Sequence, residues 1–552
     1  MNGRSIRPVE HRPELPIDRF ITKREASSEI EEVPVDVLFV GGGPAGLAGA
    51  IKLAKRTKDN PALADLTIAV LDKGERLGDH CLSGAVVNPV SLRALFPELK
   101  DSDFPFRGAV ADEGVYVLTE RAKFRVPTPP PMRNHGNYVC SICELVRWMG
   151  ERAEELGVNI LAGFPAESLL MQGGAVAGVR TTERGLARDG SRSDSYQAPS
   201  DVTAKVTVLS EGVRGSLTQA YLAAQRITST NPQIYALGVK ELWEVKRPLD
   251  RVIHTMGWPL PGDAFGGSFC YPMGENLVAI GIVVGLDYKQ HSLDTHELLQ
   301  RLKTHPLFRG ILDGGQMVEW GAKCIPEGGF ASIPDRLSGD GVLIAGDAAG
   351  FVNVAALKGV HYAIQSGIYA GEVIADALVK GDVTRASLAR YDELVRSGYI
   401  STDLRKTRNM RLAFKKGFVL GGIGAGLATV TGGALPAGNL RTGEDADDEK
   451  HVAPATAFAP DNKLTFSKLD ANFRSGNTTR DDVPLHVVQA TAPVGADVAD
   501  MLSSMCPAGV YERRGDELVI NAPNCVDCKA TDVLGPRWTP REAGSGPRYQ
   551  KM

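Results

Sequence analysis

The chain has 552 residues, a mass of 59.0 kDa and a formal charge of −4, so it is long enough for about three domains. A hydrophobic fraction of 43% and a charged fraction of 23% exclude wholesale disorder, and the near-neutral charge argues against a nucleic-acid-binding protein. Glycine is in excess, because 61 glycines are about 11% of the residues against a usual value of about 7%. We expect this surplus in cofactor loops, tight turns or close packing.

Residues 1–32 mix arginine, acidic residues and proline without an apolar run. A secretory signal needs an apolar core and a mitochondrial presequence avoids acids, so neither matches. We expect an N-terminal arm that lies extended on the protein. The eight cysteines are too few for a disulfide scaffold of this size, which favours a reducing compartment.

The first folded segment has the pattern of a βαβ unit. Residues 35–40 form a short apolar run typical of a buried parallel strand, a helical pattern follows, and residues 66–71 form the next strand. Two later strands, at 206–209 and 342–345, also lead into glycine-containing turns. Between them, β-type segments from about 235 to 324 predict an inserted antiparallel sheet.

Gly41, Gly43 and Gly46 form a G-x-G-x-x-G between the first strand and its helix. The first glycine permits a tight turn, the second lets the backbone approach a pyrophosphate, and the third allows close helix–strand packing. Asp72 ends the second strand, where its carboxylate can accept hydrogen bonds from a ribose diol. Such glycine triplets also arise by chance in loops, but the strand, helix and acid together predict dinucleotide binding.

Gly346 and Asp347 follow the strand at 342–345 and favour FAD over NAD. Asp347 can hydrogen-bond the ribityl chain, and a helix that starts near Lys358 and Gly359 can direct its N-terminus at the N1–O2 edge of a flavin. Gly212 belongs to a third expected contact zone. The alternative for Asp347 is a simple turn or cap carboxylate. The sequence has no second complete G-x-G-x-x-G, which argues against an NAD(P)H domain and favours a flavin reduced by another donor.

Residues 401–440 have the composition of a membrane-surface segment. Nineteen uncharged residues, 417–435, include seven glycines and are weakly hydrophobic for a span. We expect this segment to lie in one leaflet as a monotopic element, joined by a second patch around 84–95. A glycine-packed core helix is the alternative. Six cations precede the uncharged stretch and suit anionic headgroups: Arg405, Lys406, Arg408, Arg411, Lys415 and Lys416.

From about Val33 to its C-terminal end the chain resembles the electron-transfer flavoprotein:ubiquinone oxidoreductase family. The segments that carry the resemblance include 82–85, 237–243, 254–260, 265–269, 284–288, 327–330 and 506–512. The resemblance implies a peripheral membrane enzyme that holds FAD and one 4Fe–4S cluster, accepts electrons from electron-transfer flavoprotein and reduces ubiquinone. It also implies that the backbone at Gly266 and Gly267 contacts the quinone head group; without it, a β-bulge would be the preferred interpretation of that pair.

The expected fold is therefore α/β, with a Rossmann-like FAD-binding fold, an inserted antiparallel sheet and a C-terminal ferredoxin-like iron–sulfur domain. The expected units are an arm (1–32), the discontinuous FAD-binding domain (33–230 and 331–400), the quinone-binding domain (231–330), the membrane-surface segment (401–440) and the iron–sulfur domain (441–552).

The family holds its cluster with four cysteines, and this chain matches three of the positions, with Cys506, Cys525 and Cys528. The fourth position is Thr531. Three thiolates can hold a 3Fe–4S cluster, or a cube whose fourth iron takes oxygen from Asp532, Thr531 or water. Other possibilities also stay open: a cysteine distant in sequence (Cys140, Cys143, Cys270 or Cys324), loss of the cluster, and a zinc site that joins Cys140 and Cys143 to Cys525 and Cys528.

The resemblance implies electron transfer without a side chain that does acid–base chemistry on a substrate. In a bacterium, this activity would lie on the cytoplasmic face of the inner membrane. The alternatives are an FAD-dependent hydroxylase or prenyl reductase, which would need no iron–sulfur module, and a cluster-deficient paralogue.

Overall fold

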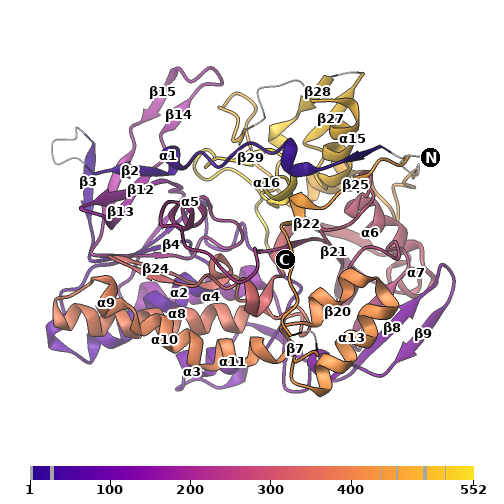
Figure 1. Ribbon diagram of the computed structural model, residues 1–552, viewed down its shortest axis with the longest axis horizontal. Coiled ribbons are helices and arrows are strands. Elements are labelled where there is room, and N and C mark those ends of the chain that lie inside the picture. Colours follow the sequence, from indigo (N-terminus) through magenta and orange to yellow (C-terminus); the bar gives the residue numbers. More distant parts are fainter. Residues whose placement is uncertain (1–3, 25–29, 437, 455–457, 489–493, 516) are drawn as a thin grey trace.

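A computed structural model describes residues 4–24, 30–436, 438–454, 458–488, 494–515 and 517–552 (Figure 1). Residues 1–3 and 25–29 of the expected arm and residue 437 of the expected membrane-surface segment lie outside the described residues.

A six-stranded sheet forms the centre of one half of the molecule. Its spatial order is β11 (Asn159–Ala162), β5 (Ile68–Asp72), β4 (Val37–Val40), β17 (Val206–Leu209), β24 (Val342–Ile344) and β23 (Ser338–Gly339). All neighbours are parallel except β23, which runs antiparallel to β24. Every residue of β4 and β17 is buried, as expected for strands covered on both faces. The predicted Rossmann-like α/β fold is confirmed.

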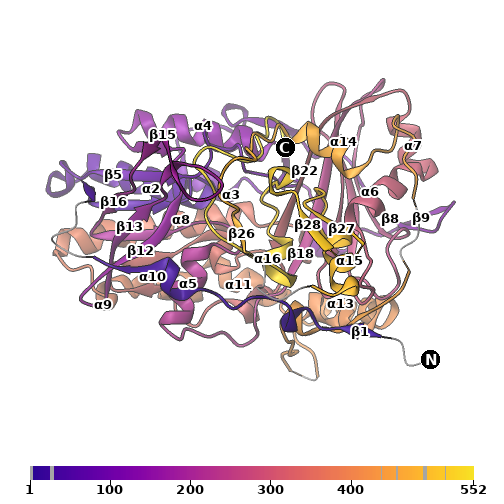
Figure 2. The same cartoon turned by 90° about the horizontal axis from the view of Figure 1, so that it is seen from above.

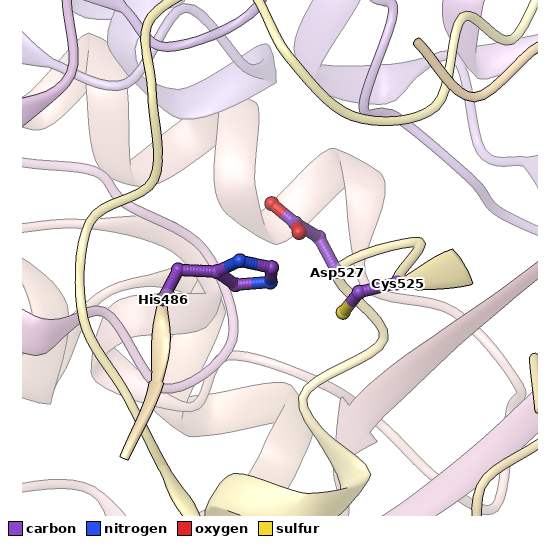
Figure 3. Close-up of side chains that lie close together, drawn as sticks. All are labelled: His486, Cys525 and Asp527. Carbon is purple, nitrogen blue, oxygen red and sulfur yellow. The ribbon is translucent and has the colours of Figure 1, made fainter. Parts of the chain in front are cut away.

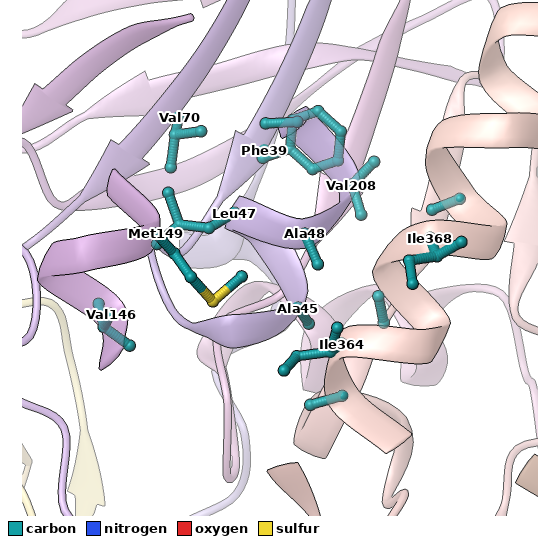
Figure 4. Close-up of a cluster of buried hydrophobic side chains, with 14 of the residues drawn as sticks. Phe39, Ala45, Leu47, Ala48, Val70, Val146, Met149, Val208, Ile364 and Ile368 are labelled. Carbon is teal, nitrogen blue, oxygen red and sulfur yellow. The ribbon is translucent and has the colours of Figure 1, made fainter. Parts of the chain in front are cut away.

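Two long helices, α2 (Pro44–Lys58) and α8 (Val360–Lys380), pack against each other and against this sheet (Figure 4). Their close approach depends on glycine. A Cβ on Gly367 would lie 2.2 Å from the Ala45 carbonyl oxygen, and one on Gly371 would lie 2.7 Å from the Gly49 carbonyl oxygen. Some of the surplus glycine therefore serves helix packing.

The inserted antiparallel sheet is also present, with seven strands. Its order is β22 (Gln316–Pro326), β18 (Tyr235–Glu244), β21 (Leu277–Gly285), β20 (Gly266–Pro272), β19 (Val252–Gly257), β8 (Glu113–Leu118) and β9 (Lys123–Val126). Only the β19–β8 pair is parallel. The sheet thus reaches beyond residues 231–330, because β8 and β9 come from the segment expected to belong to the FAD-binding domain. Two helices, α6 (Thr295–Thr304) and α7 (Pro306–Leu312), follow β21 in the chain.

The N-terminal arm crosses the molecule in both views (Figures 1 and 2). Its first strand, β1 (Ser5–Ile6), pairs with β25 (Lys450–His451). Two further strands, β2 (Ile21–Lys23) and β3 (Glu31–Pro34), complete a five-stranded sheet with β12 (Ala166–Gln172), β13 (Ala175–Thr181) and β16 (Ser200–Thr203). The arm is therefore held by backbone hydrogen bonds at both of its ends.

The C-terminal module packs on the seven-stranded sheet and shares one apolar core with it. Its main elements are α14 (Lys468–Asn472), β26 (Val487–Val488), α15 (Ala496–Met505), β27 (Tyr511–Arg514), β28 (Glu517–Ile520), α16 (Ala530–Leu534) and β29 (Arg537–Trp538). The last residues return to the other half of the molecule, where buried Met552 accepts a hydrogen bond from Ser141 Oγ through its carbonyl oxygen (3.1 Å).

The remaining elements connect these layers. The helices are α1 (Ile17–Phe20), α3 (Val90–Leu95), α4 (Ile142–Glu155), α5 (Ser216–Ala224), α9 (Arg385–Leu388), α10 (Arg390–Ser397), α11 (Tyr399–Lys406), α12 (Met410–Ala413) and α13 (Phe418–Val430). A three-stranded sheet joins β6 (Val86–Val87), β10 (Tyr138–Cys140) and β7 (Phe106–Ala109), and β14 (Arg184–Leu186) pairs with β15 (Arg192–Gln197).

Candidate functional site

The predicted dinucleotide loop joins β4 to α2. A Cβ on Gly41 would lie 2.3 Å from the Ser210 carbonyl oxygen, and one on Gly46 would lie 2.1 Å from the Gly41 carbonyl oxygen, so both positions require glycine. Gly43 is different. It precedes the first residue of α2, and a Cβ there would meet no atom within 4 Å. Open space over a bare peptide at a helix N-terminus suits a pyrophosphate.

Asp72 ends β5, as predicted. Its carboxylate accepts hydrogen bonds from the backbone N–H groups of Gly42 and Gly74, both at 2.8 Å. The side chain therefore holds the glycine loop in place. Each carboxylate oxygen keeps a second lone pair, so the arrangement still permits hydrogen bonds from a ribose diol.

Asp347 lies in the turn that follows β24, formed by Gly346–Ala349. Gly346 has φ +68°, and a Cβ there would lie 2.8 Å from the Ala45 Cβ, which places this turn beside the dinucleotide loop. Burial raises the pKa of Asp347 to about 6, and Lys323 opposes that rise. Its carboxylate forms no side-chain hydrogen bond to any of the described residues. An unsatisfied carboxylate at this edge of the sheet fits the hydroxyl groups of a ribityl chain.

Lys358 and Gly359 lie at the start of α8. The Lys358 ammonium donates to Asn134 Oδ1 (2.7 Å) and to the Ala356 carbonyl oxygen (3.0 Å), and burial lowers its pKa to about 8. Gly359 precedes the first residue of this 21-residue helix, whose N-terminus carries partial positive charge. Gly212 has φ +75° with open space around it, and it follows the Ser210–Glu211 backbone that contacts Gly41. These cofactor assignments stay predictions.

Gly266 and Gly267 open strand β20. A Cβ on Gly266 would lie 2.1 Å from the Val283 carbonyl oxygen, and one on Gly267 would lie 2.8 Å from the Thr255 carbonyl oxygen. The packing of the neighbouring strands therefore already requires both glycines. The quinone contact at this pair stays a prediction.

The same sheet contains a buried histidine–tyrosine pair that the sequence does not predict. His254 Nε2 and the Tyr271 hydroxyl are 2.7 Å apart, joining β19 to β20. Burial lowers the pKa of His254 to about 3, with a further contribution from the charge of Lys358, so the imidazole is neutral. A Cβ on Gly84 would lie 3.2 Å from Tyr271 Cε2. The alternating strand pattern predicts burial of both side chains, but only the strand register brings them together.

Helix α13 follows the cation-rich segment and exposes an apolar stripe. Its exposed fractions are 62% for Leu420, 67% for Ile423, 45% for Leu427 and 86% for Val430, at a spacing that places these side chains on one side of a helix. A Cβ on Gly421 would lie 2.6 Å from Phe414 Cα, and the Phe414 ring lies 5.4 Å from that of Phe265, beside the glycine pair. The exposed stripe is therefore close to the expected quinone site.

Arg411, which the sequence predicts to face a membrane, does not do so. Arg411 is buried, and its guanidinium donates to Glu327 (2.6 Å) and Asp287 (2.8 Å) while it lies over the Phe265 ring. Asp287 follows strand β21 and Glu327 follows strand β22. The long-range fold, and not the local charge pattern, therefore decides the role of Arg411. An open groove of about 470 Å³ is lined by other cations of this region, namely Arg396, Arg405, Lys406 and Arg408.

The three predicted cluster cysteines are buried in the C-terminal module. Cys506 ends α15, and Cys525 and Cys528 precede α16. Burial, followed by the charges of all three thiols, raises the pKa of Tyr511 well above its usual range. Among the described residues, no three thiols have their sulfur atoms within 4.8 Å of one another. Two sulfurs on one zinc ion are at most about 4.6 Å apart, so the described thiols are not arranged around a single zinc ion.

The oxygen donors near the fourth position are already engaged. Thr531 Oγ1 accepts a hydrogen bond from Trp538 Nε1 (3.1 Å), and the Asp532 carboxylate pairs with Arg214 (2.5 Å). Figure 3 shows a further group, in which donor atoms of His486, Cys525 and Asp527 lie within 4.8 Å of one another. Asp527 is engaged too, because its two oxygens bind Lys73 and Arg541 at 2.5 Å.

Cations surround the cysteine loop. Lys73 and Arg541 bind Asp527, and the Lys323 ammonium donates to the Asp527 carbonyl oxygen (3.1 Å). Burial lowers the pKa of Lys323 to about 8. Since a thiolate-bound cluster is anionic, this environment fits such a group. The charge of Lys323 also lowers the pKa of Asp347, so one ammonium group acts on both the cysteine loop and the expected flavin site.

The fold and the paired sites define a FAD-dependent flavoprotein oxidoreductase that carries an additional iron–sulfur module. A geranylgeranyl bacteriochlorophyll reductase-like protein from Thermoplasma acidophilum has a similar fold, with a TM-score of 0.56 and 20% identity over 72% of this chain and 90% of that one. That likeness concerns the fold alone.

The chain belongs to the electron transfer flavoprotein-ubiquinone oxidoreductase family. It is 38% identical to the mitochondrial electron transfer flavoprotein-ubiquinone oxidoreductase of Oryza sativa subsp. japonica, over 95% of this chain and 94% of that protein. It is 36% identical to the Mus musculus relative of the same name, over 94% and 89%. The family models for the ubiquinone-binding domain and the 4Fe-4S domain match residues 235–325 and 462–550.

Proposed function

We propose that this chain accepts electrons from a reduced electron transfer flavoprotein and passes them through an iron–sulfur cluster and FAD to ubiquinone. The observation that carries this proposal is the ion pair between Lys73 and Asp527 (2.5 Å). Lys73 directly follows Asp72, the acid at the end of β5 that hydrogen-bonds the glycine loop, and Asp527 lies between Cys525 and Cys528. The segment expected to bind a ribose of FAD therefore contacts the cysteine loop, which supports adjacent flavin and cluster sites. When bound, a flavin converts one-electron into two-electron transfer.

The protein's own groups bind, orient and supply protons. The glycine loop and α2 take the pyrophosphate, Asp347 takes the ribityl hydroxyls, and the start of α8 faces the flavin ring. Tyr271 and His254 hold an exchangeable proton between Tyr271 Oη and His254 Nε2, on the sheet that carries Gly266 and Gly267. Reduction of a quinone consumes two protons, and we infer that this buried pair supplies one of them.

We further propose that the protein is a monotopic membrane protein, on the cytoplasmic face of the inner membrane in a bacterial cell. The exposed stripe of α13 and the basic groove beside it support this placement, since apolar side chains enter the lipid boundary and cations bind anionic headgroups. No helix in the described part of the chain is long and apolar enough to cross a bilayer.

The test is quinone reduction by the purified protein, driven either by reduced electron transfer flavoprotein or by NAD(P)H. We expect turnover only with the flavoprotein. Turnover with a nicotinamide alone would overturn the proposal and favour a hydroxylase or prenyl reductase. No turnover with either donor, from protein that contains FAD, would instead identify a paralogue that has lost electron transfer.

A further inference from the structure

The cluster of this chain lacks one ligand at the position its family uses. Cys506, Cys525 and Cys528 supply three thiolates, whereas the fourth position is Thr531, whose hydroxyl accepts a hydrogen bond from Trp538. A 4Fe–4S cluster is ordinarily held by four thiolates. The structure therefore has to supply the fourth from elsewhere if the cube is complete.

Cys324 is the buried thiol that the fold brings to this place. It lies near the end of β22, the edge strand of the seven-stranded sheet, and is 3% exposed. Its backbone N–H donates to the Cys528 carbonyl oxygen at 2.8 Å. A hydrogen bond thus joins the quinone-binding sheet directly to the cysteine loop, at a residue that is itself an expected ligand.

The thiol of Cys324 is close enough to the cysteine loop to interact electrostatically with residues on both sides of Thr531. Burial raises the pKa of Cys528 most. The thiol of Cys324 raises it further, by more than the thiol of Cys506 does. Asp532 directly follows Thr531 and forms an ion pair with Arg214, and the charges of both residues affect the pKa of Cys324. Cys324 is therefore close to residues on both sides of Thr531, at positions 528 and 532. It also belongs to the same apolar core as the other three thiols.

Other donors fit this role less well. Asp527 and Asp532 are neutralised by cations, and Cys140 and Cys143 lie in the core of the other half of the molecule. Buried His486 has a free Nε2, but the imidazole lies within 4.8 Å of Cys525 Sγ. That spacing suits two ligands of one metal ion, whereas a cube needs its fourth ligand on a separate iron.

We propose that Cys324 is the fourth ligand of the iron–sulfur cluster. The inference rests on the proposed presence of that cluster, and it gives the module a metal–thiolate bond to the quinone-binding sheet. The cluster would then connect two parts of the chain that are about 180 residues apart in sequence.

The experiment compares the complete protein with its Cys324→Ala variant, both purified without oxygen. Iron, sulfide and FAD are quantified per chain, and EPR spectra are recorded before and after reduction. We expect about four irons in the parent protein and about three in the variant, with a 3Fe–4S signal in the oxidised state and an unchanged FAD content. Cys270→Ala is the matched control, because Cys270 is another buried free thiol in the same sheet and should keep all of its iron.

A second variant guards against simple loss of structure. Cys324→Ala combined with Thr531→Cys should restore the fourth iron and the parent EPR spectrum, because it rebuilds the family's ligand set. The proposal is overturned if Cys324→Ala keeps its irons and spectrum, if the double variant restores nothing, or if His486→Ala alone produces the three-iron signal. Iron-free parent protein that still reduces quinone would overturn both this ligand and the cluster step of the proposed function, and would leave only electron transfer from the flavoprotein through FAD to quinone.

Discussion

The charged form of Asp347 lowers the free energy of unfolding of the FAD-free protein, because burial raises the pKa of its carboxylate to about 6. In the unfolded chain an aspartate titrates near about 3.9. The stabilising contribution of its proton is therefore complete below about pH 4 and is lost as the pH rises through 6. A group with this property is retained for binding and not for stability.

We predict opposite effects of Asp347→Asn on stability and on binding. At pH 7 the FAD-free variant should be more stable than the parent by about 1–3 kcal/mol, because the charged form is no longer buried. Its affinity for FAD should fall by about 10-fold or more, since a hydrogen bond to a charged group is lost. Thermal unfolding at pH 4 and 7 and a fluorescence titration with FAD measure the two effects.

The control for this prediction is Asp65→Asn, which changes an exposed carboxylate before β5 of the same sheet. It should alter neither quantity. Unchanged FAD affinity in Asp347→Asn would exclude a ribityl contact.

Among the described residues, the Tyr271 hydroxyl is the hydrogen-bond partner of His254 Nε2, at 2.7 Å. We predict that Tyr271→Phe slows quinone reduction by about 100-fold, the usual range for loss of a proton donor. Reduction of the bound flavin by electron transfer flavoprotein should keep its rate. Stopped-flow absorbance separates the two half-reactions.

Tyr288→Phe is the matched control. It removes another buried hydroxyl, and this hydroxyl has no hydrogen-bond partner among the described residues. Equal slowing in both variants, or slowing of the flavin half-reaction in Tyr271→Phe, would contradict a role for Tyr271 in proton delivery.

At the scale of single elements, helix α13 exposes the apolar surface that we assign to membrane binding. Leu420, Ile423, Leu427 and Val430 form an exposed stripe that no described residue covers. Burying two such side chains in lipid stabilises the bound state by about 3–6 kcal/mol. We predict that the double variant Ile423→Asp/Val430→Asp binds anionic vesicles at least about 100-fold more weakly in a sedimentation assay.

Phe473→Asp is the control for α13, since Phe473 is 85% exposed on a different element. It should sediment with vesicles like the parent. Retained vesicle binding by the double variant would show that α13 is not the membrane anchor.

Elements that the sequence predicts well are those whose determinants are contiguous. The strand at 37–40, its glycine loop and α2 follow one another directly, so their pattern alone identifies a dinucleotide site. Contacts between distant segments are not encoded in this way. The sequence does not indicate that β8 pairs with β19, that Arg411 turns inward to Asp287, or that Cys324 meets Cys528, because each depends on the relative placement of whole sheets.

At the scale of the whole molecule, the last residues link the two halves. Arg147 on α4 donates to the carbonyl oxygens of Tyr549 (2.5 Å) and Gln550 (2.9 Å), and Glu319 on β22 accepts from the N–H groups of Gln550 and Lys551. We predict that Arg147→Ala increases amide hydrogen exchange in residues 547–552 by about 10-fold or more, because about 1–3 kcal/mol of hydrogen bonding is lost.

The thiol of Cys143 should also become more reactive in this variant, since its backbone N–H contacts Met552. Arg152→Ala on the same helix is the control, because the ion pair of Arg152 is with a largely exposed Glu155 of that helix. Protection of residues 547–552 that does not change would indicate that burial alone retains this segment.

The Lys73–Asp527 ion pair has a consequence for biogenesis. One partner follows the acid expected to bind the flavin's ribose, and the other stands between two expected iron ligands, so each loop is ordered by the other. Filling one site should therefore lower the free energy needed to fill the second, and this coupling is reciprocal. In a cell short of iron, we expect the newly made chain to retain flavin poorly as well, so that iron supply controls the amount of loaded flavoprotein.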